Sequence, residues 1–406
     1  MLDDKKTYEI RKDFALFDTN DSIAYLDNGA TSLKPKAVID KMNEYYANYG
    51  VNIHRGVYHL SYKATDEFDI ARAKVAKFIN ANESEIIFVR NASEALNLCA
   101  LTFGRDYLSE GDEVIVSELE HHSSILPWQV LCKEKKANLK YVPLNEDGRI
   151  TVENFKKVLS DKTKVVALTY VSNVMGYVTP IKEIIKLAHE YNAYVVVDAA
   201  QAVPHMKIDV KDLDCDFLGF SGHKMMGPTG VGVLYGRKKI LKTLKPLYYG
   251  GDMNEEVYKD NVDVKDVPYR FETGTPAIAE VIGLGKAIDY IESIGFDYIH
   301  NHSMELYNYT INKLKDLDGI TIYNKNPEVP IIAFNITGIH PHDAATVFDE
   351  GGVCLRAGHH CAQLLTKWLD CAGTLRGSFY VYNTKEDADK FIEKVKETID
   401  FFKRVW

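Results

Sequence analysis

The sequence predicts an α/β protein in which helices cover a mostly parallel central sheet, followed by a smaller α+β C-terminal domain. Between about Lys74 and Asp289, short apolar runs alternate with segments of helical periodicity, which is typical of parallel strands buried on both faces. After about Ala287, long helical stretches surround short strands. We therefore expect three parts: an N-terminal segment (1–20) that packs on the small domain, a large domain (21–288) and a small C-terminal domain (289–406).

The expected elements follow one another in chain order. A short helix is expected over 8–18, and a strand over 24–27 enters a turn at Asn28-Gly29-Ala30. The strands of the large domain are expected at 86–89, 113–116, 164–168, 194–198, 217–220 and 230–235. Its clearest helices begin at Ser93 and extend from Ile181 to Glu190.

The small domain is expected to hold a strand at 331–335 and to end in a long helix. Thr384 followed by Asp387 resembles a capping box at the start of that helix. The apolar positions behind it have helical spacing and predict one buried face: Ala388, Phe391, Val395, Ile399 and Phe402.

Composition excludes several classes of protein. Of the 406 residues, 46% are hydrophobic and 26% are charged, and these ordinary globular values exclude a disordered or fibrous chain. The formal charge of −9 and the lack of a basic stripe argue against nucleic-acid binding. No apolar run is long enough to span a membrane, and no signal-peptide core is visible. Six cysteines without a Cys-x-x-Cys pair argue against a disulfide scaffold, so we expect a cytoplasmic enzyme with reduced thiols.

Two residues at predicted strand ends carry the strongest chemical signal. Asp198 ends a buried strand, and Lys224 follows a later strand within Ser221-Gly222-His223-Lys224. Open α/β sheets bind ligands at the carboxyl ends of their strands. Pyridoxal phosphate needs both groups, because a lysine amine forms a Schiff base with its aldehyde and a carboxylate pairs with its pyridinium nitrogen. Taken alone, Asp198 would be a helix cap and Lys224 a surface lysine, whereas together they favour the cofactor.

A phosphate site fits beside them. The strand at 86–89 leads through a tight connection into the helix that starts at Ser93, and helix starts favour anions. The Ser221 hydroxyl and His223 would add donors. Taken alone, Ser93 is better explained as an N-cap.

Further motifs make the resemblance to a known family specific. Asp198-Ala-Ala-Gln201 and Ser221-Gly-His-Lys224 resemble the class V aminotransferase-like, pyridoxal phosphate-dependent enzymes. Arg356-Ala-Gly-His-His-Cys361 resembles the SUF-type (group II) cysteine desulfurases. The resemblance extends from about residue 20 to 385, and implies the type I fold of pyridoxal phosphate-dependent transferases, with the cofactor in the large domain and the catalytic cysteine in the small one.

The resemblance implies roles around the cofactor. Lys224 would be the Schiff-base lysine and the proton carrier, and His121 would stack on the ring. Asp198 would stabilise the pyridinium, and Gln201 would bind the ring hydroxyl. The phosphate would be held by Ala92, Ser93, Ser221 and His223. Thr275 would reach the phosphate of the other subunit, which implies a homodimer. The Asn91-Ala92-Ser93 turn departs from the Gly-Thr-Thr type usual in the family, so one hydroxyl contact to the phosphate would be missing.

The resemblance also implies roles around the substrate. Arg376 would bind the substrate carboxylate through its planar fork, with Asn173 beside it. The other expected substrate contacts are Ala30, His54 and Arg356. Cys361 would be the nucleophile, its thiolate favoured by positive charge on His359, His360 and Arg356. A buried structural thiol is the alternative for Cys361, with Cys354 and Cys371 as rivals; metal binding by His-His-Cys is disfavoured because adjacent residues converge poorly on one ion.

The implied reaction converts L-cysteine to L-alanine and leaves a persulfide on Cys361. The sulfur would then pass to a SufU- or SufE-like acceptor protein for iron–sulfur cluster assembly. A selenocysteine lyase would use the same scaffold, and comparing rates with cysteine and selenocysteine separates the two. Another class V enzyme, such as an aminotransferase or epimerase, would not need the thiol. A catalytically silent scaffold would be colourless when purified.

Overall fold

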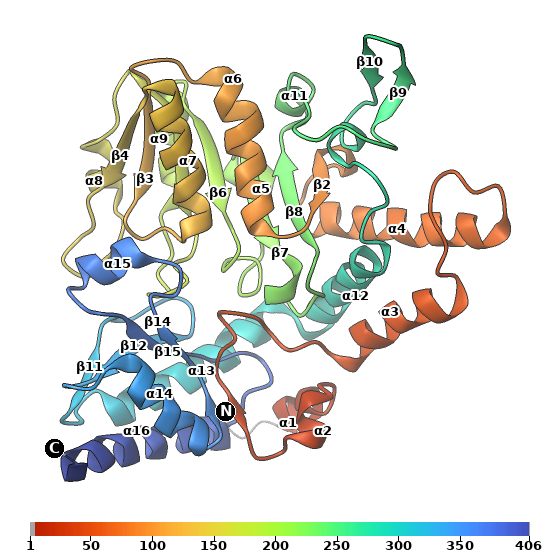
Figure 1. Cartoon of the computed structure of the whole chain (residues 1–406). Coiled ribbons are helices and arrows are strands. Elements are labelled where there is room, and N and C mark those ends of the chain that lie inside the picture. Colours follow the sequence, from red (N-terminus) through yellow and green to blue (C-terminus); the bar gives the residue numbers. More distant parts are fainter. Residues whose placement is uncertain (1–4, 406) are drawn as a thin grey trace.

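The computed structural model describes residues 5–405, and its centre is a seven-stranded sheet (Figure 1). The strands lie in the order β2-β8-β7-β6-β5-β3-β4, and all are parallel except β8, which runs antiparallel to both neighbours. The predicted mostly parallel sheet and the α/β class are confirmed. The strand bounds are β2 (Ile86–Val89), β3 (Glu113–Ser117), β4 (Asn138–Val142), β5 (Thr163–Thr169), β6 (Tyr194–Asp198), β7 (Phe217–Ser221) and β8 (Gly232–Gly236).

Both faces of this central sheet are buried, which explains its continuous apolar strands. Val114 and Val116 of β3 belong to a core that includes Trp128 of α7, whereas Ile115 belongs to a second core that includes Ile184 of α9. Helices α5 and α7 cross one face (Figure 1). The helices of this part are α3 (Lys36–Asn48), α4 (His59–Phe78), α5 (Ala92–Leu98), α6 (Arg105–Tyr107), α7 (His122–Lys135), α8 (Val152–Lys156), α9 (Ile181–Glu190), α10 (Val210–Leu213), α11 (Lys238–Leu241) and α12 (Ile278–Ile294). A π-helix, Cys99–Gly104, joins α5 to α6.

A second, antiparallel sheet lies below the central one in Figure 1, in the order β11-β12-β15-β14. We call it the C-terminal sheet. Helices α13, α14 and α16 cover it and share a separate apolar core. The bounds are β11 (Ile320–Ile322), β12 (Ile331–Ile336), β14 (Arg356–Gly358), β15 (Thr374–Ser378), α13 (Phe296–Leu314), α14 (Pro341–Glu350), α15 (Gln363–Trp368) and α16 (Lys385–Val405).

Helix α16 begins as the sequence predicts. The Thr384 N–H donates to Asp387 Oδ2 (3.1 Å), and the Asp387 N–H donates to Thr384 Oγ1 (3.3 Å), which is a reciprocal cap. On the predicted face, four side chains are buried and Phe402 is half-buried; the buried four are Ala388, Phe391, Val395 and Ile399.

The N-terminal helix expected over 8–18 is two helices, α1 (Lys5–Arg11) and α2 (Leu16–Thr19). The chain leaves the helix between them because Phe14 is fully buried, with its ring 4.5 Å from that of Tyr382. Arg11 is paired with Asp387 (2.8 Å), so this segment contacts the start of α16. Residues 1–4 of the expected segment lie outside the described residues.

Helix α12 continues through residue 288, where we expected one domain to end, and it packs against α3 and α4. Two short pairs complete the fold: β1 (Ala24–Tyr25) with β13 (Val353–Cys354), and the hairpin β9 (Asn254–Val257) with β10 (Val262–Val264). Within residues 5–405, no helix has the length and apolar character needed to cross a membrane.

Candidate active site

One cavity lies between the two sheets, at the carboxyl ends of β5, β6 and β7. Its volume is about 300 Å³, and we call it the Lys224 cavity. It brings together most of the residues singled out from the sequence: Ala30, Ala92, Ser93, His121, Asn173, Asp198, Gln201, Ser221, His223, Lys224, Arg356, Cys361 and Arg376. Residues 300 positions apart in the chain therefore share one site.

Asp198 and Lys224 supply a carboxylate and an amine to this cavity. Asp198 ends β6, and its Oδ1 accepts the Ala200 N–H at 3.0 Å. Burial raises the pKa of Asp198. Lys224 closes the 3₁₀ turn Gly222–Lys224 directly after β7. Burial lowers the pKa of Lys224 to about 8, although the charge of Asp198 opposes the shift.

The lowered pKa of Lys224 gives a pH dependence that can be measured. Only the neutral amine attacks an aldehyde, and a lysine with an ordinary pKa of about 10.4 is mostly protonated at pH 8. We expect the rate at which the cofactor-free protein takes up pyridoxal phosphate to rise with pH and to level off just above the pKa of about 8. Stopped-flow absorbance from pH 6 to 10 measures this. A rate that keeps rising to pH 10 would contradict a buried, low-pKa lysine.

His121 is held as a neutral ring. It caps α7, and its Nδ1 accepts the Ser123 N–H at 3.1 Å, so the ring proton is on Nε2. Burial lowers the pKa of His121 to about 3, and the positive charge of Lys224 adds to the effect. Burial also raises the pKa of the preceding residue, Glu120, to about 8. The Glu120 carboxyl therefore adds little negative charge near Asp198 at neutral pH. A neutral imidazole is suited to contact with an aromatic ring.

Hydroxyl and N–H groups gather at the start of α5. The cap of this helix is Asn91, which accepts the Glu94 N–H at 3.0 Å, so the helix starts one residue before the expected Ser93. Ser93 is thereby free to share a hydrogen bond with Ser123 (Oγ to Oγ 2.6 Å), and the Ala92 N–H donates to Ser221 Oγ at 2.8 Å. Sequence reasoning missed Ser123, although it directly follows the histidine pair. Ser123 also lines the Lys224 cavity.

Gln201 is fixed in orientation, and His223 is held in its neutral form. Gln201 is buried, and its Nε2 donates to the Gly29 carbonyl at 2.6 Å, so its side-chain oxygen remains available to a donor. Burial lowers the pKa of His223 to about 4, so this ring is neutral near pH 7.

Arg376 is a buried cation with free hydrogen-bonding capacity. Its Nη1 donates to the Asn173 carbonyl (2.8 Å), and its Nη2 donates to Asp27 Oδ1 (3.3 Å). Its Nε is buried and has no hydrogen-bond partner among the described residues. An unsatisfied guanidinium N–H is costly, which suits a site that receives an anion. Asp27, which also binds Arg356, was not singled out as a site residue, because the sequence marks it only as the end of a strand before a turn.

Cys361 differs from the other cysteines in its exposure. All six lie within the described residues, and Cys361 is exposed, whereas Cys354 and Cys371 are half-buried and the rest buried. Burial raises the pKa of Cys354, which disfavours its thiolate. Cys361 has a left-handed φ of +56°, and its carbonyl accepts the His122 N–H at 2.7 Å. The turn thus presents the Cys361 thiol on a fixed backbone.

One expectation about Cys361 is wrong. His360 does not lend positive charge, because its ring is buried. The hydrogen bond that its Nε2 donates to the Thr374 carbonyl (2.9 Å) favours the charged form, but burial outweighs it. Burial lowers the pKa of His360 to about 2, and Arg376 adds to the effect. The His359 ring shares a hydrogen bond with Thr366 (Nδ1 to Oγ1 2.9 Å). Arg356 lines the cavity with Cys361 and carries a permanent charge.

Among residues 5–405, no group of side chains is arranged to hold a metal ion.

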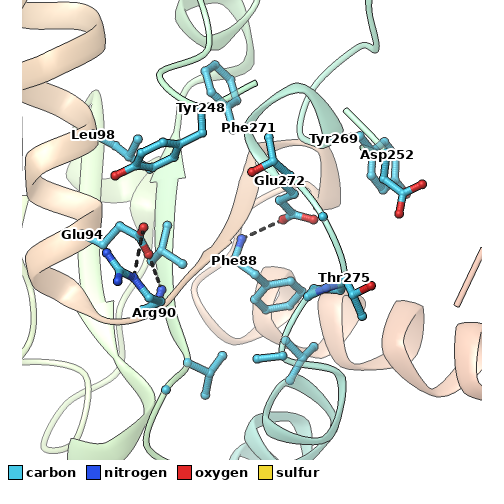
Figure 2. A pocket seen from close by; sticks show the side chains of 18 of the residues that line it. Phe88, Arg90, Glu94, Leu98, Tyr248, Asp252, Tyr269, Phe271, Glu272 and Thr275 are labelled. Carbon is cyan, nitrogen blue, oxygen red and sulfur yellow. Dashed lines mark hydrogen bonds and ion pairs between the residues drawn. The ribbon is translucent and has the colours of Figure 1, made fainter. Parts of the chain in front are cut away.

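Two predicted site residues lie elsewhere. His54 and Thr275 line a separate pocket of about 270 Å³ with Tyr269 and Asp252, shown in Figure 2. The expectation that His54 lines the Lys224 cavity is therefore wrong within one chain. The reason is local: the His54 ring packs edge-on to Phe68 (6.0 Å) and Tyr269 (6.1 Å).

Comparisons with known proteins identify the family of this chain. The aminotransferase class-V family model matches residues 24–391. A probable cysteine desulfurase of Halalkalibacterium halodurans is 48% identical over 98% of this chain and 99% of the relative, and one of Staphylococcus aureus is 46% identical over 97% of each. Among solved structures, cysteine desulfurases from Escherichia coli (34% identity, TM-score 0.92) and Thermococcus onnurineus (39% identity, TM-score 0.93) each cover 97% of this chain, which in turn covers 98% of each.

The chain belongs to the class V aminotransferase family of pyridoxal phosphate-dependent enzymes. Within that family it is a cysteine desulfurase. The Lys224 cavity fits the cofactor on its own chemistry: an amine of lowered pKa, a buried carboxylate, a neutral imidazole and a group of hydroxyls face the same space.

Proposed function

We propose that this enzyme takes sulfur from L-cysteine, holds it as a persulfide on Cys361 and releases L-alanine. The observation that carries the proposal is that the single exposed cysteine of the described chain shares a cavity with Lys224 and Arg376. An amine, a carboxylate receptor and a thiol are the three groups that this reaction requires.

The residues divide the work as follows. When bound, pyridoxal phosphate captures the substrate amine and withdraws electrons from the substrate Cα. Arg376 binds the substrate carboxylate, with its unpartnered Nε as one donor. With the cofactor bound, Asp198 would keep the ring nitrogen protonated, and the neutral His121 would lie against the ring. The Lys224 amine takes the Cα proton, for which a pKa of about 8 is suited near neutral pH.

Cys361 performs the sulfur transfer. Its thiolate attacks the substrate sulfur, so that an S–S bond forms as the Cβ–S bond breaks, and the electron pair of that bond goes to the substrate carbon. That carbon is then protonated, and the sum is L-cysteine plus a thiol giving L-alanine plus a persulfide. No outside oxidant is needed, because the substrate carbon is reduced as the sulfur is oxidised.

We also propose a homodimer with shared sites. Thr275 lines the separate pocket of Figure 2 and is not among the residues that line its own Lys224 cavity. This arrangement supports the expectation that Thr275 serves the phosphate of a second subunit.

The persulfide is proposed to pass to a SufU- or SufE-like acceptor in the cytoplasm, for iron–sulfur cluster assembly. The exposure of Cys361 supports direct transfer to a second protein, since an incoming thiolate can reach its sulfur from solvent.

Mass spectrometry after L-cysteine addition tests the proposal. We expect one additional sulfur atom on the peptide that contains Cys361, removable by a reducing thiol, together with an equal amount of alanine. Peptides with Cys354 and Cys371 are internal controls and should be unmodified. Alanine formed without the adduct, or an adduct on a control peptide, would contradict the role of Cys361.

A further inference from the structure

Two arginines of the Lys224 cavity are direct cross-strand neighbours. Arg356 of β14 lies opposite Arg376 of β15 in their antiparallel register. Like charges in opposed positions repel and destabilise a sheet. Asp27 lies between them: it accepts from Arg356 Nη2 at 2.9 Å and Nε at 3.1 Å, and from Arg376 Nη2 at 3.3 Å. One carboxylate therefore separates two cations that would otherwise face each other.

The two arginines are held in different surroundings. The Arg376 side chain is 2% exposed, whereas that of Arg356 is 49% exposed, at the mouth of the cavity with Cys361. The backbone at Gly29 also packs closely against Arg376: a Cβ at this position would lie 3.1 Å from the Arg376 Cζ. Arg376 is thus fixed by Asn173, Asp27 and Gly29, with Nε left over.

Asp27 itself lies on a fixed backbone. The Leu26 N–H donates to the Cys354 carbonyl (2.8 Å), and the Ser378 N–H donates to the Leu26 carbonyl (2.7 Å). The Ala30 N–H donates to the Asp27 carbonyl at 3.0 Å. Because this backbone is held, the Asp27 carboxylate is offered to both arginines from one place in the site.

We infer that Asp27 is a positioning residue that assigns the two arginines to separate tasks. It holds Arg356 at the exposed edge of the cavity that Cys361 also lines, and it keeps Arg376 in the interior, where the unpartnered Nε is available to a substrate carboxylate. This inference rests on the proposed role of Arg376. Without the charge of Asp27, repulsion between the guanidinium groups displaces Arg376 from its binding position.

The test is the variant Asp27→Asn, which keeps the shape and removes the charge. L-Alanine is the probe, titrated against the cofactor absorbance of the holoenzyme, because its binding needs the carboxylate site but not Cys361. We expect its dissociation constant to rise about tenfold, the size expected for a lost charge-assisted contact. The KM for L-cysteine should rise by a similar factor, with a smaller fall in kcat.

A second substitution distinguishes positioning from a merely structural effect. In Asp27→Asn with Arg356→Gln, the repelling cation is also gone, and we expect L-alanine to bind within about threefold of wild type. Asp216→Asn is the matched control, because Asp216 is a buried carboxylate paired with Arg237 (3.0 Å) before β7, away from the strand ends of the site. It should lower the melting temperature without weakening L-alanine binding.

The outcomes separate this inference from the proposed role of Arg376. Wild-type L-alanine binding by Asp27→Asn, or a loss that Arg356→Gln does not relieve, overturns the inference. If Asp27→Asn does not fold, the double variant is compared with Arg356→Gln alone, and weaker L-alanine binding by the double variant overturns it. Unchanged L-alanine binding by Arg376→Gln instead overturns the proposed carboxylate site.

Discussion

Replacing Cys361 with serine is expected to lower the formation of alanine and sulfide from L-cysteine by at least about a thousandfold, as for loss of a covalent nucleophile. A serine hydroxyl is not ionised near neutral pH and does not attack a thiol sulfur. Because Cys361 is exposed, the substitution removes no core packing, and the melting temperature should stay close to that of wild type. The purified variant should also keep the cofactor absorbance, since Lys224 and Asp198 are untouched.

The matched controls are Cys354→Ser and Cys371→Ser, both at half-buried positions. Each should retain turnover within a few-fold, at some cost in stability. Sulfide and alanine are measured separately, so that a slow release of persulfide is not mistaken for a failure of the chemistry. Wild-type alanine formation by the Cys361 variant would exclude it as the nucleophile.

The parts of the fold that could be predicted are those set by local pattern. The run Tyr194 to Asp198 is apolar and largely β-branched, and the helix from Ile181 to Glu190 has the bounds read from the sequence. Asp198 and Lys224 could be placed because strand ends of one sheet meet at one edge. The short break at Phe14 could not be predicted, because it depends on burial against Tyr382, which is 368 residues later in the chain (382 − 14).

The site shows the same division between local and long-range information. The sequence marks Asp27 only as the end of a strand before a turn, and its importance comes from ion pairs with Arg356 and Arg376. In the sequence His360 is expected to be a cation beside Cys361, yet burial and the charge of Arg376 keep it neutral, although its hydrogen bond to the Thr374 carbonyl opposes the shift. The sequence shows which titratable side chains are present, whereas the charge that each one carries depends on the neighbours that the fold places around it.

The second large effect is expected from Lys224→Ala. This variant should lose the borohydride-reducible link between the protein and pyridoxal phosphate, and turnover of L-cysteine should fall at least about a thousandfold, because both the attachment point and the Cα proton carrier are removed. Intact mass after borohydride treatment measures the link directly. The variant should still bind free pyridoxal phosphate, since Asp198 and the hydroxyls near Ser93 remain.

Lys34→Met is the matched control, because burial lowers the pKa of Lys34 to about 8 as well. The Lys34 amine, however, donates to Thr31 Oγ1 (2.8 Å) and to the His223 carbonyl (3.2 Å), and Lys34 itself does not line the Lys224 cavity. The control should therefore keep the reducible link. If the link persisted in Lys224→Ala and vanished in Lys34→Met, the cofactor would be attached to Lys34 and the assignment to Lys224 would be wrong. The opposite result shows that position at the end of β7, rather than pKa alone, selects the lysine that binds the cofactor.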